Sequence, residues 1–285
     1  MPPLSQVLDL LLHLVLPAVL ASAGVLALLY FTIGAHFARF AAPFAVAAGL
    51  TLGNWSRSLL AWQPQSFGYE SLLGTAAVVL FGCLAAELIR TRSATTAQFV
   101  IPTLIALVAA WIVLPTPIRT PLWFLGTAAL FLGNRLVIER RAADQKPPGT
   151  APAFLAMALG GTTALLMLFL MSGKFSELAI LLASAMIGLA IVAAILKANV
   201  NSALPLAAIY WSALVIASFH ELSHEMPHAC FVLVAAAPLL LALMLLPPAQ
   251  RLPLWSRHLI DAVLLALPLL IAVGLMFSTG ELSFE

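Results

Sequence analysis

The chain has 285 residues, of which 63% are hydrophobic and only 8% are charged. Because so few charged side chains cannot cover the surface of a soluble domain of this size, the composition predicts an all-α, polytopic integral membrane protein. The net charge is only +2 and the basic residues are scattered, so the sequence argues against nucleic-acid binding and predicts the lipid bilayer as the partner.

Ten apolar segments are long enough to be predicted as transmembrane helices, which need about 20 residues each. Helices fit better than the strands of a barrel, because the segments are apolar all round and not on alternate residues. Within the first segment, Leu10 to Leu20 resembles the core of a signal peptide, but Asp9 and no Lys or Arg precedes it, so we interpret the segment as an uncleaved span. The predicted spans are 7–33, 38–53, 71–89, 97–114, 121–138, 153–172, 176–196, 203–220, 229–246 and 258–277.

Lys and Arg residues in the connections set the predicted orientation, because short cytoplasmic loops carry an excess of them. Connections after odd-numbered spans hold most of the 13 basic residues, whereas the other side holds only Arg57, Arg119 and Lys174. We therefore expect a cell (inner) membrane protein with both termini on the outer side. The basic residues on the predicted inner side are Arg39, Arg90, Arg92, Arg135, Arg140, Arg141, Lys146, Lys197, Arg251 and Arg257.

A short internal repeat indicates two related halves. Residues 114–123 and 246–255 share the pattern Leu-Pro-x-x-x-Arg-x-Pro-Leu-Trp, in which Arg and Trp are scarce residue types for this chain. Since five spans per half is an odd number, the halves would cross the membrane in opposite senses, as a 5+5 inverted repeat. We expect a first half over 1–138, a cytoplasmic polar linker over 139–152 and a second half over 153–285. The same residues also fit a simple duplication of a helix start at the membrane surface.

In size and span count the chain resembles compact ten-helix carriers such as the drug/metabolite transporter superfamily. The resemblance is one of layout and implies a permease for a small molecule, and no motif of that family is present to identify residues.

Residues inside the spans supply candidates for a substrate pathway. Asp9 and His13 are ionisable residues in the first span, although a local hydrogen bond at a helix end explains them as well. Pro17, Pro238 and Pro268 each remove a backbone hydrogen bond inside a span, which either lines a pathway or is a tolerated kink.

Segment 220–228 contains the pattern His-Glu-x-x-His. On a helix this spacing puts His220 and His224 on one face, where they can bind zinc with Glu221 as general base, and His228 is a further ligand candidate. The spacing selects no third ligand, and a hydrated outer turn between two spans explains the same residues.

Three functions stay open on the sequence. The first is a small-molecule transporter, with no enzymatic activity and no cofactor. The second is a non-catalytic membrane subunit or scaffold, bound to a membrane-protein partner or to a second copy of itself, and the scarcity of polar residues within the spans favours it. The third is a zinc-dependent membrane hydrolase that uses His220, Glu221 and His224.

Overall fold

All regular structure in the described part of the chain is helical, as the composition predicts. The computed structural model describes residues 4–34, 38–58, 67–90, 99–115, 119–143, 173–222 and 228–278, and these ranges contain no β-strand. In chain order the elements are α1 (Leu4–Leu10), the π-helix η1 (Leu11–Val15), α2 (Leu16–Ile33), α3 (Ala38–Ser58), α4 (Phe67–Arg90), α5 (Ile101–Val113), α6 (Pro121–Ala143), α8 (Gly173–Leu196), the 3₁₀ turn η5 (Asn201–Ala203), α9 (Leu204–Leu222), α10 (His228–Ala236), the 3₁₀-helix η6 (Ala237–Leu245), α11 (Pro247–Gln250) and α12 (Leu254–Ser278).

Several of these helices fit a membrane-embedded protein. Large apolar side chains stand on the outside of the bundle, among them Phe31, Leu122 and Ile195, as expected of a surface that faces lipid. Three shorter apolar helices cover Thr75–Ile89, Ile101–Val113 and Ala229–Leu245. Among the described residues, five helices are long and apolar enough to cross a bilayer, namely Leu8–Ile33, Pro121–Arg141, Lys174–Leu196, Asn201–Phe219 and Trp255–Leu275.

The predicted spans coincide with helices wherever the structure describes them. The predicted sixth span, 153–172, lies outside the described residues. α3 occupies the predicted second span, but it includes Arg39 and Arg57 and is not among the helices that meet the length and composition of a membrane crossing. The count of ten crossings is therefore not confirmed.

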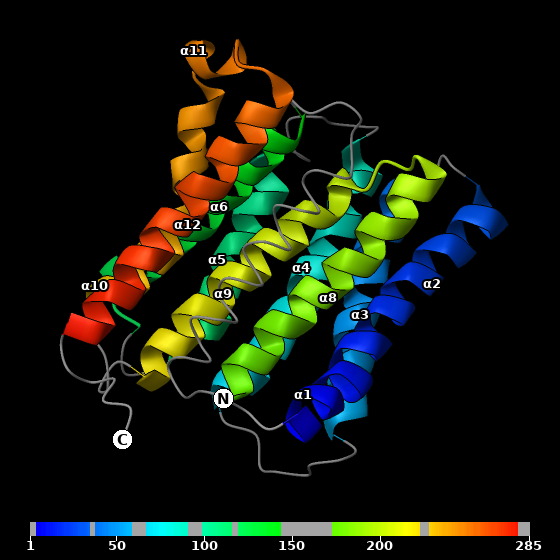
Figure 1. The fold of residues 1–285 in the computed structure, drawn as a ribbon, viewed down its shortest axis with the longest axis horizontal. Coiled ribbons are helices and arrows are strands. Elements are labelled where there is room, and N and C mark those ends of the chain that lie inside the picture. Colours follow the sequence, from blue (N-terminus) through cyan, green and yellow to red (C-terminus); the bar gives the residue numbers. More distant parts are fainter. Residues whose placement is uncertain are drawn as a thin grey trace.

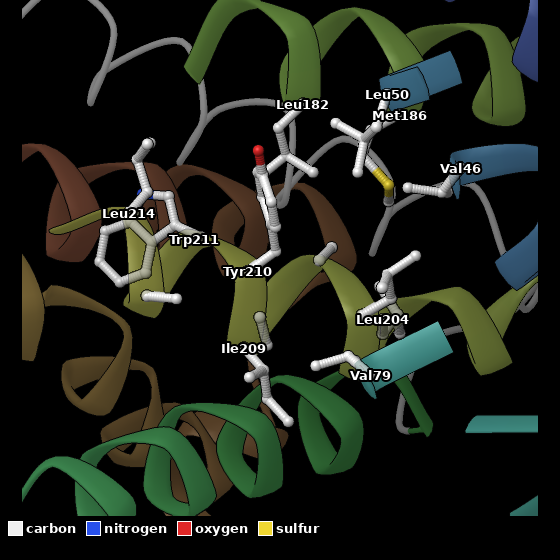
Figure 2. Close-up of a cluster of buried hydrophobic side chains, with 14 of the residues drawn as sticks. Val46, Leu50, Val79, Leu182, Met186, Leu204, Ile209, Tyr210, Trp211 and Leu214 are labelled. Atoms are coloured by element: carbon white, nitrogen blue, oxygen red, sulfur yellow. The ribbon is translucent and has the colours of Figure 1, made fainter. Parts of the chain in front are cut away.

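α9 forms the centre of the bundle and is the most buried of the five candidate spans. It packs against α4, α6, α8 and α10, so helices from early and late parts of the chain meet on it. Figure 2 shows Tyr210 and Leu204 of α9 within a buried cluster that also takes Val46 from α3, Val79 from α4 and Met186 from α8. The core is thus built around one apolar helix, as expected of a bundle in which helices shield one another from lipid.

α2, α3 and α8 approach one another closely because small residues line their contacts. A Cβ atom added to Gly188 of α8 would overlap Ser22 Oγ and the Val19 carbonyl oxygen of α2. One added to Gly49 of α3 would stand 2.8 Å from Ala185 Cβ of α8, closer than real Cβ atoms come to other atoms. Glycine lets helix backbones pack tightly in a membrane, where dispersion and hydrogen bonds drive association.

One end of the bundle gathers most of the described charges. Glu87 near the end of α4 lies 3.8 Å from Arg39 at the start of α3, and Ser202 of η5 donates a hydrogen bond to the Arg39 carbonyl. The end of α6 meets the start of α12 there through Arg141 and Asp261. α1 begins and α12 ends at the opposite end of the bundle (Figure 1). The basic residues predicted on the inner side therefore share one end wherever they are described, and which side of the membrane that end faces stays a prediction.

The two copies of the repeat occupy equivalent turns at opposite ends of the bundle. α5 ends at Val113 and η6 at Leu245, and each is followed by an extended leucine, Leu114 or Leu246. The wider packing is less symmetric, because α6 packs along α9, whereas no comparable contact joins α12 to α4, the helices that the repeat would pair with them. The 5+5 inverted repeat is therefore not confirmed for the described helices.

We expect Gly188→Ala to destabilise the protein, because the new methyl group has to push α2 and α8 apart. Overpacking of this kind costs about 1–3 kcal/mol. Gly24→Ala in α2 is the matched control, because open space surrounds that position. Thermal unfolding in detergent measures both variants, and equal midpoints would contradict the close approach at Gly188.

Candidate functional site: a polar seam on α6

Three buried polar residues lie on one face of α6. Thr127, Asn134 and Arg141 are separated by seven residues each, or about two helical turns, and each is at most 3% exposed. We call them the polar seam. α6 packs against α9 and η6, so the seam lies in the half of the bundle away from α2. Polar residues inside a membrane helix are rare and costly, which makes them candidates for function.

Asn134 joins three helices by hydrogen bonds. Its Nδ2 donates to Ser212 Oγ of α9 at 3.0 Å and to the Ala235 carbonyl of α10 at 3.1 Å. Ser212 Oγ in turn donates to the Ala208 carbonyl one turn earlier in α9, at 2.7 Å. Because a backbone carbonyl only accepts, these contacts fix which side of the Asn134 amide carries the nitrogen.

Pro238 removes one backbone donor that the Ala235 carbonyl would otherwise have. At Ala237 the α-helix α10 gives way to the 3₁₀-helix η6, in which each N–H bonds the carbonyl three residues earlier. Pro238 has no N–H, so it has no hydrogen to donate to Ala235. The amide of Asn134 donates to the same carbonyl from a neighbouring helix. Asn134 and Pro238 thus form one structural unit.

Asn134 has one further property that bears on ligand binding. Its side chain is fully buried, and among the described residues its Oδ1 atom has no hydrogen-bond partner. A buried acceptor without a donor costs free energy, and such atoms in native structures call for an explanation. The Oδ1 atom is free to accept a hydrogen bond from a polar group that enters the bundle.

Arg141 and Asp261 form a bidentate ion pair at the charged end. Arg141 Nε and Nη2 donate to the two carboxylate oxygens of Asp261 at 3.0 and 2.7 Å, and both side chains are 1% exposed. His258 Nδ1 lies 4.0 Å from Asp261 Oδ2, one turn earlier in α12. The parallel geometry is the strongest that an arginine makes with a carboxylate. It ties the end of α6 to the start of α12.

The residues that the sequence suggested for a pathway are not brought together. Asp9 Oδ1 and His13 Nε2 lie 3.8 Å apart and are 43% and 42% exposed, on the part of the chain that packs on α3 and α8. Pro17 follows η1, the π-helix that contains His13, and Pro268 is buried within α12. Of the five candidates, only Pro238 adjoins the polar seam. The roles of the others stay predictions.

The His-Glu cluster falls largely outside the described residues. His220 and Glu221 belong to the last turn of α9, His228 begins α10, and His224 lies in the part that the structure does not describe. Elsewhere in the described ranges, no three His, Cys, Asp or Glu side chains are grouped so as to hold a metal ion. The zinc-site prediction therefore stays a prediction.

Sequence reasoning missed the polar seam. A lone Asn within the apolar run 121–138 was a usable signal, because an amide inside a membrane helix needs a partner. Arg141 was assigned to the polar linker that begins at 139, whereas α6 continues to Ala143 and buries Arg141. Its partner Asp261 lies 120 positions along the chain, and no local pattern connects the two.

No protein-family model matches the chain, and no curated protein matches it. The function is therefore inferred from the polar seam itself. Its two features are the Asn134 amide beside the interrupted helix and the Arg141–Asp261 ion pair at the charged end.

We expect Asn134→Leu to lower the free energy of unfolding by about 1–3 kcal/mol, because the Ala235 carbonyl loses its donor. Ser212→Ala is the matched comparison, since it removes one acceptor and leaves the bond to Ala235 intact. The loss of unfolding free energy in Ser212→Ala should be nearer ~0.6 kcal/mol, the average for hydrogen bonds between membrane helices. Equal losses for the two variants, measured by denaturation in detergent, would rule out the special role of the carbonyl.

Removing one partner of the ion pair should be more damaging than removing both. Arg141→Leu takes the bidentate partner away from the buried Asp261 carboxylate, and such a loss costs about 3–5 kcal/mol. The double variant Arg141→Leu with Asp261→Leu removes both charges and should recover much of that stability. A double variant that is less stable than Arg141→Leu would contradict the ion pair.

Proposed function

We propose that the protein is a membrane transporter for a small polar molecule, with a pathway along the polar seam. The observation that carries the proposal is the buried Asn134 amide, whose Oδ1 atom has no partner among the described residues. It stands beside the interruption between α10 and η6. In transporters, substrate sites commonly lie beside interrupted helices near the middle of the membrane.

Each part of the seam has a role in this proposal. Asn134 Oδ1 accepts a hydrogen bond from the substrate, while its Nδ2 keeps the Ala235 carbonyl satisfied. The 3₁₀-helix η6 forms the movable wall, because its backbone is already interrupted at Pro238. The Arg141–Asp261 pair closes the charged end and separates when the pathway opens there. Binding and movement suffice, and no catalytic step is involved.

The proposal also includes ten crossings of the cell membrane, with both termini on its outer side. The alternating directions of the described helices support it. α6 ends at the charged end and α8 begins at the opposite end, which is what a sixth crossing between them requires (Figure 1). The turns after Val113 and Leu245 support an inverted relation of the halves, although the packing of α9 does not repeat.

A second candidate function is a non-catalytic membrane subunit. The close packing of α2, α3 and α8 through Gly49 and Gly188 favours it, because a helix group without room to move suits a scaffold. A scaffold would purify with a fixed partner or as a stable oligomer.

Cysteine accessibility tests the pathway directly. In a chain whose buried Cys83 and Cys230 are replaced by Ala, we expect Asn134→Cys to react with a small charged methanethiosulfonate in membrane vesicles. Leu136→Cys is the control on the same helix, since that side chain is exposed on the apolar outside of the bundle and should be far less reactive. If position 134 is no more reactive than position 136, no aqueous pathway reaches the seam, and the scaffold becomes the better hypothesis.

A further inference from the structure

A cavity of about 160 Å³ lies between α3, α4, α8 and α9, apart from the polar seam. Leu178 and Leu181 of α8 and Tyr210 of α9 are buried and form its floor. Ala76 of α4 and Leu50 of α3 line its sides. The wall is therefore almost wholly apolar, and Figure 2 shows Leu50 and Tyr210 directed into the same region of the core.

The mouth of the cavity opens between α3 and α4 on the outside of the bundle. Thr51, Ala77 and Phe81 line it and are exposed, and Phe81 is 70% exposed. Thr51 adds little polarity, because its hydroxyl donates to the Ala47 carbonyl at 2.8 Å. An exposed phenylalanine at the rim suits contact with hydrocarbon and not with water.

Size decides which ligands fit. An apolar cavity of about 150 Å³ stays dry and takes a molecule the size of benzene, whereas pockets for drug-sized ligands measure about 300–1,000 Å³. The cavity therefore suits a short length of hydrocarbon and is too small for a typical metabolite. Its one polar end is Asn54, beside the exposed Trp55 in the last turns of α3. Tryptophan at such a helix end is typical of the headgroup level of a bilayer.

We propose that this cavity is a binding site for a bilayer phospholipid. Part of an acyl chain enters between α3 and α4 and lies on Leu178, Leu181 and Tyr210, and the polar part of the lipid lies near Asn54. The occupant follows from the surroundings, because the medium at the mouth of an apolar cavity in a membrane protein is phospholipid hydrocarbon. The site does not depend on the transport proposal, since its lining residues are not part of the seam.

Photolabelling of the full-length protein in phosphatidylcholine vesicles tests the site. The probe is a phosphatidylcholine with a diazirine in one acyl chain, and mass spectrometry maps the adducts. We expect several-fold more label at Thr51, Ala77 and Phe81 than at Leu122 and Leu125 of α6, which are also exposed on the outside of the bundle. Equal labelling of the two sets would overturn the proposal.

A variant and a second probe sharpen the result. Ala76→Leu fills the cavity and should reduce labelling at its mouth several-fold, whereas Ala129→Leu on the exposed side of α6 should not. Ala47→Leu fills the cavity from α3 and serves if the first variant does not fold. Unchanged labelling in a folded cavity-filled variant would overturn the proposal. The second probe is a free fatty acid with the same diazirine, used at the same membrane concentration. If it labels the cavity about tenfold more than the phospholipid does, the proposal of a phospholipid is also overturned.

Discussion

A backbone carbonyl in hydrocarbon has no water to bond, so a proline inside a membrane helix frees a carbonyl that another donor or a change of helix type can satisfy. This bundle does both at Pro238, where α10 becomes the 3₁₀-helix η6 and Asn134 donates to the Ala235 carbonyl. The same constraint is visible at Pro17, which follows the π-helix η1. The amide that α6 carries to this carbonyl brings an oxygen as well as a nitrogen, and that Oδ1 atom has no donor among the described residues.

Two different kinds of contact hold the two sides of the bundle together. α2, α3 and α8 are joined by small residues such as Gly49 and Gly188, which leave no room for relative movement. α6, α9, α10 and α12 are joined instead by Asn134, Ser212 and the Arg141–Asp261 pair, which are few and directional. A directional contact can be broken and remade in a second arrangement, whereas interlocked backbones resist displacement. This difference is why we place movement and substrate along α6 and assign the glycine-packed helices a supporting role.

The sequence predicted the helical class and the positions of the described helices, because apolar runs of this length have few alternatives in a membrane. It also placed Arg141 and the start of the tenth span, where Asp261 lies, near the same membrane surface, because the number of crossings fixes the side of each. It failed to predict that they pair, and it ended the fifth span at 138 because Glu139, Arg140 and Arg141 look like a loop. The pairing depends on how α6 and α12 pack, and a single sequence does not contain that information in any local pattern. The sequence shows Asn134 as a lone Asn in an apolar run, but its hydrogen-bond partner is a carbonyl 101 positions away, which no local pattern identifies.

Cross-linking of α6 to α9 measures the central contact most directly. The chain would carry Asn134→Cys and Ser212→Cys, with Cys83 and Cys230 replaced by Ala and a protease site inserted in the predicted linker after 143. Asn134 Nδ2 and Ser212 Oγ are 3.0 Å apart, so thiols at the two positions face each other across the contact of α6 with α9, and a short bifunctional methanethiosulfonate can join them. The account predicts that this reagent joins the two proteolytic fragments and that reduction separates them, whereas the pair Leu136→Cys with Ser212→Cys stays unlinked. Absence of a bond between 134 and 212, or equal linking from position 136, would contradict the placement of Asn134 in the bundle.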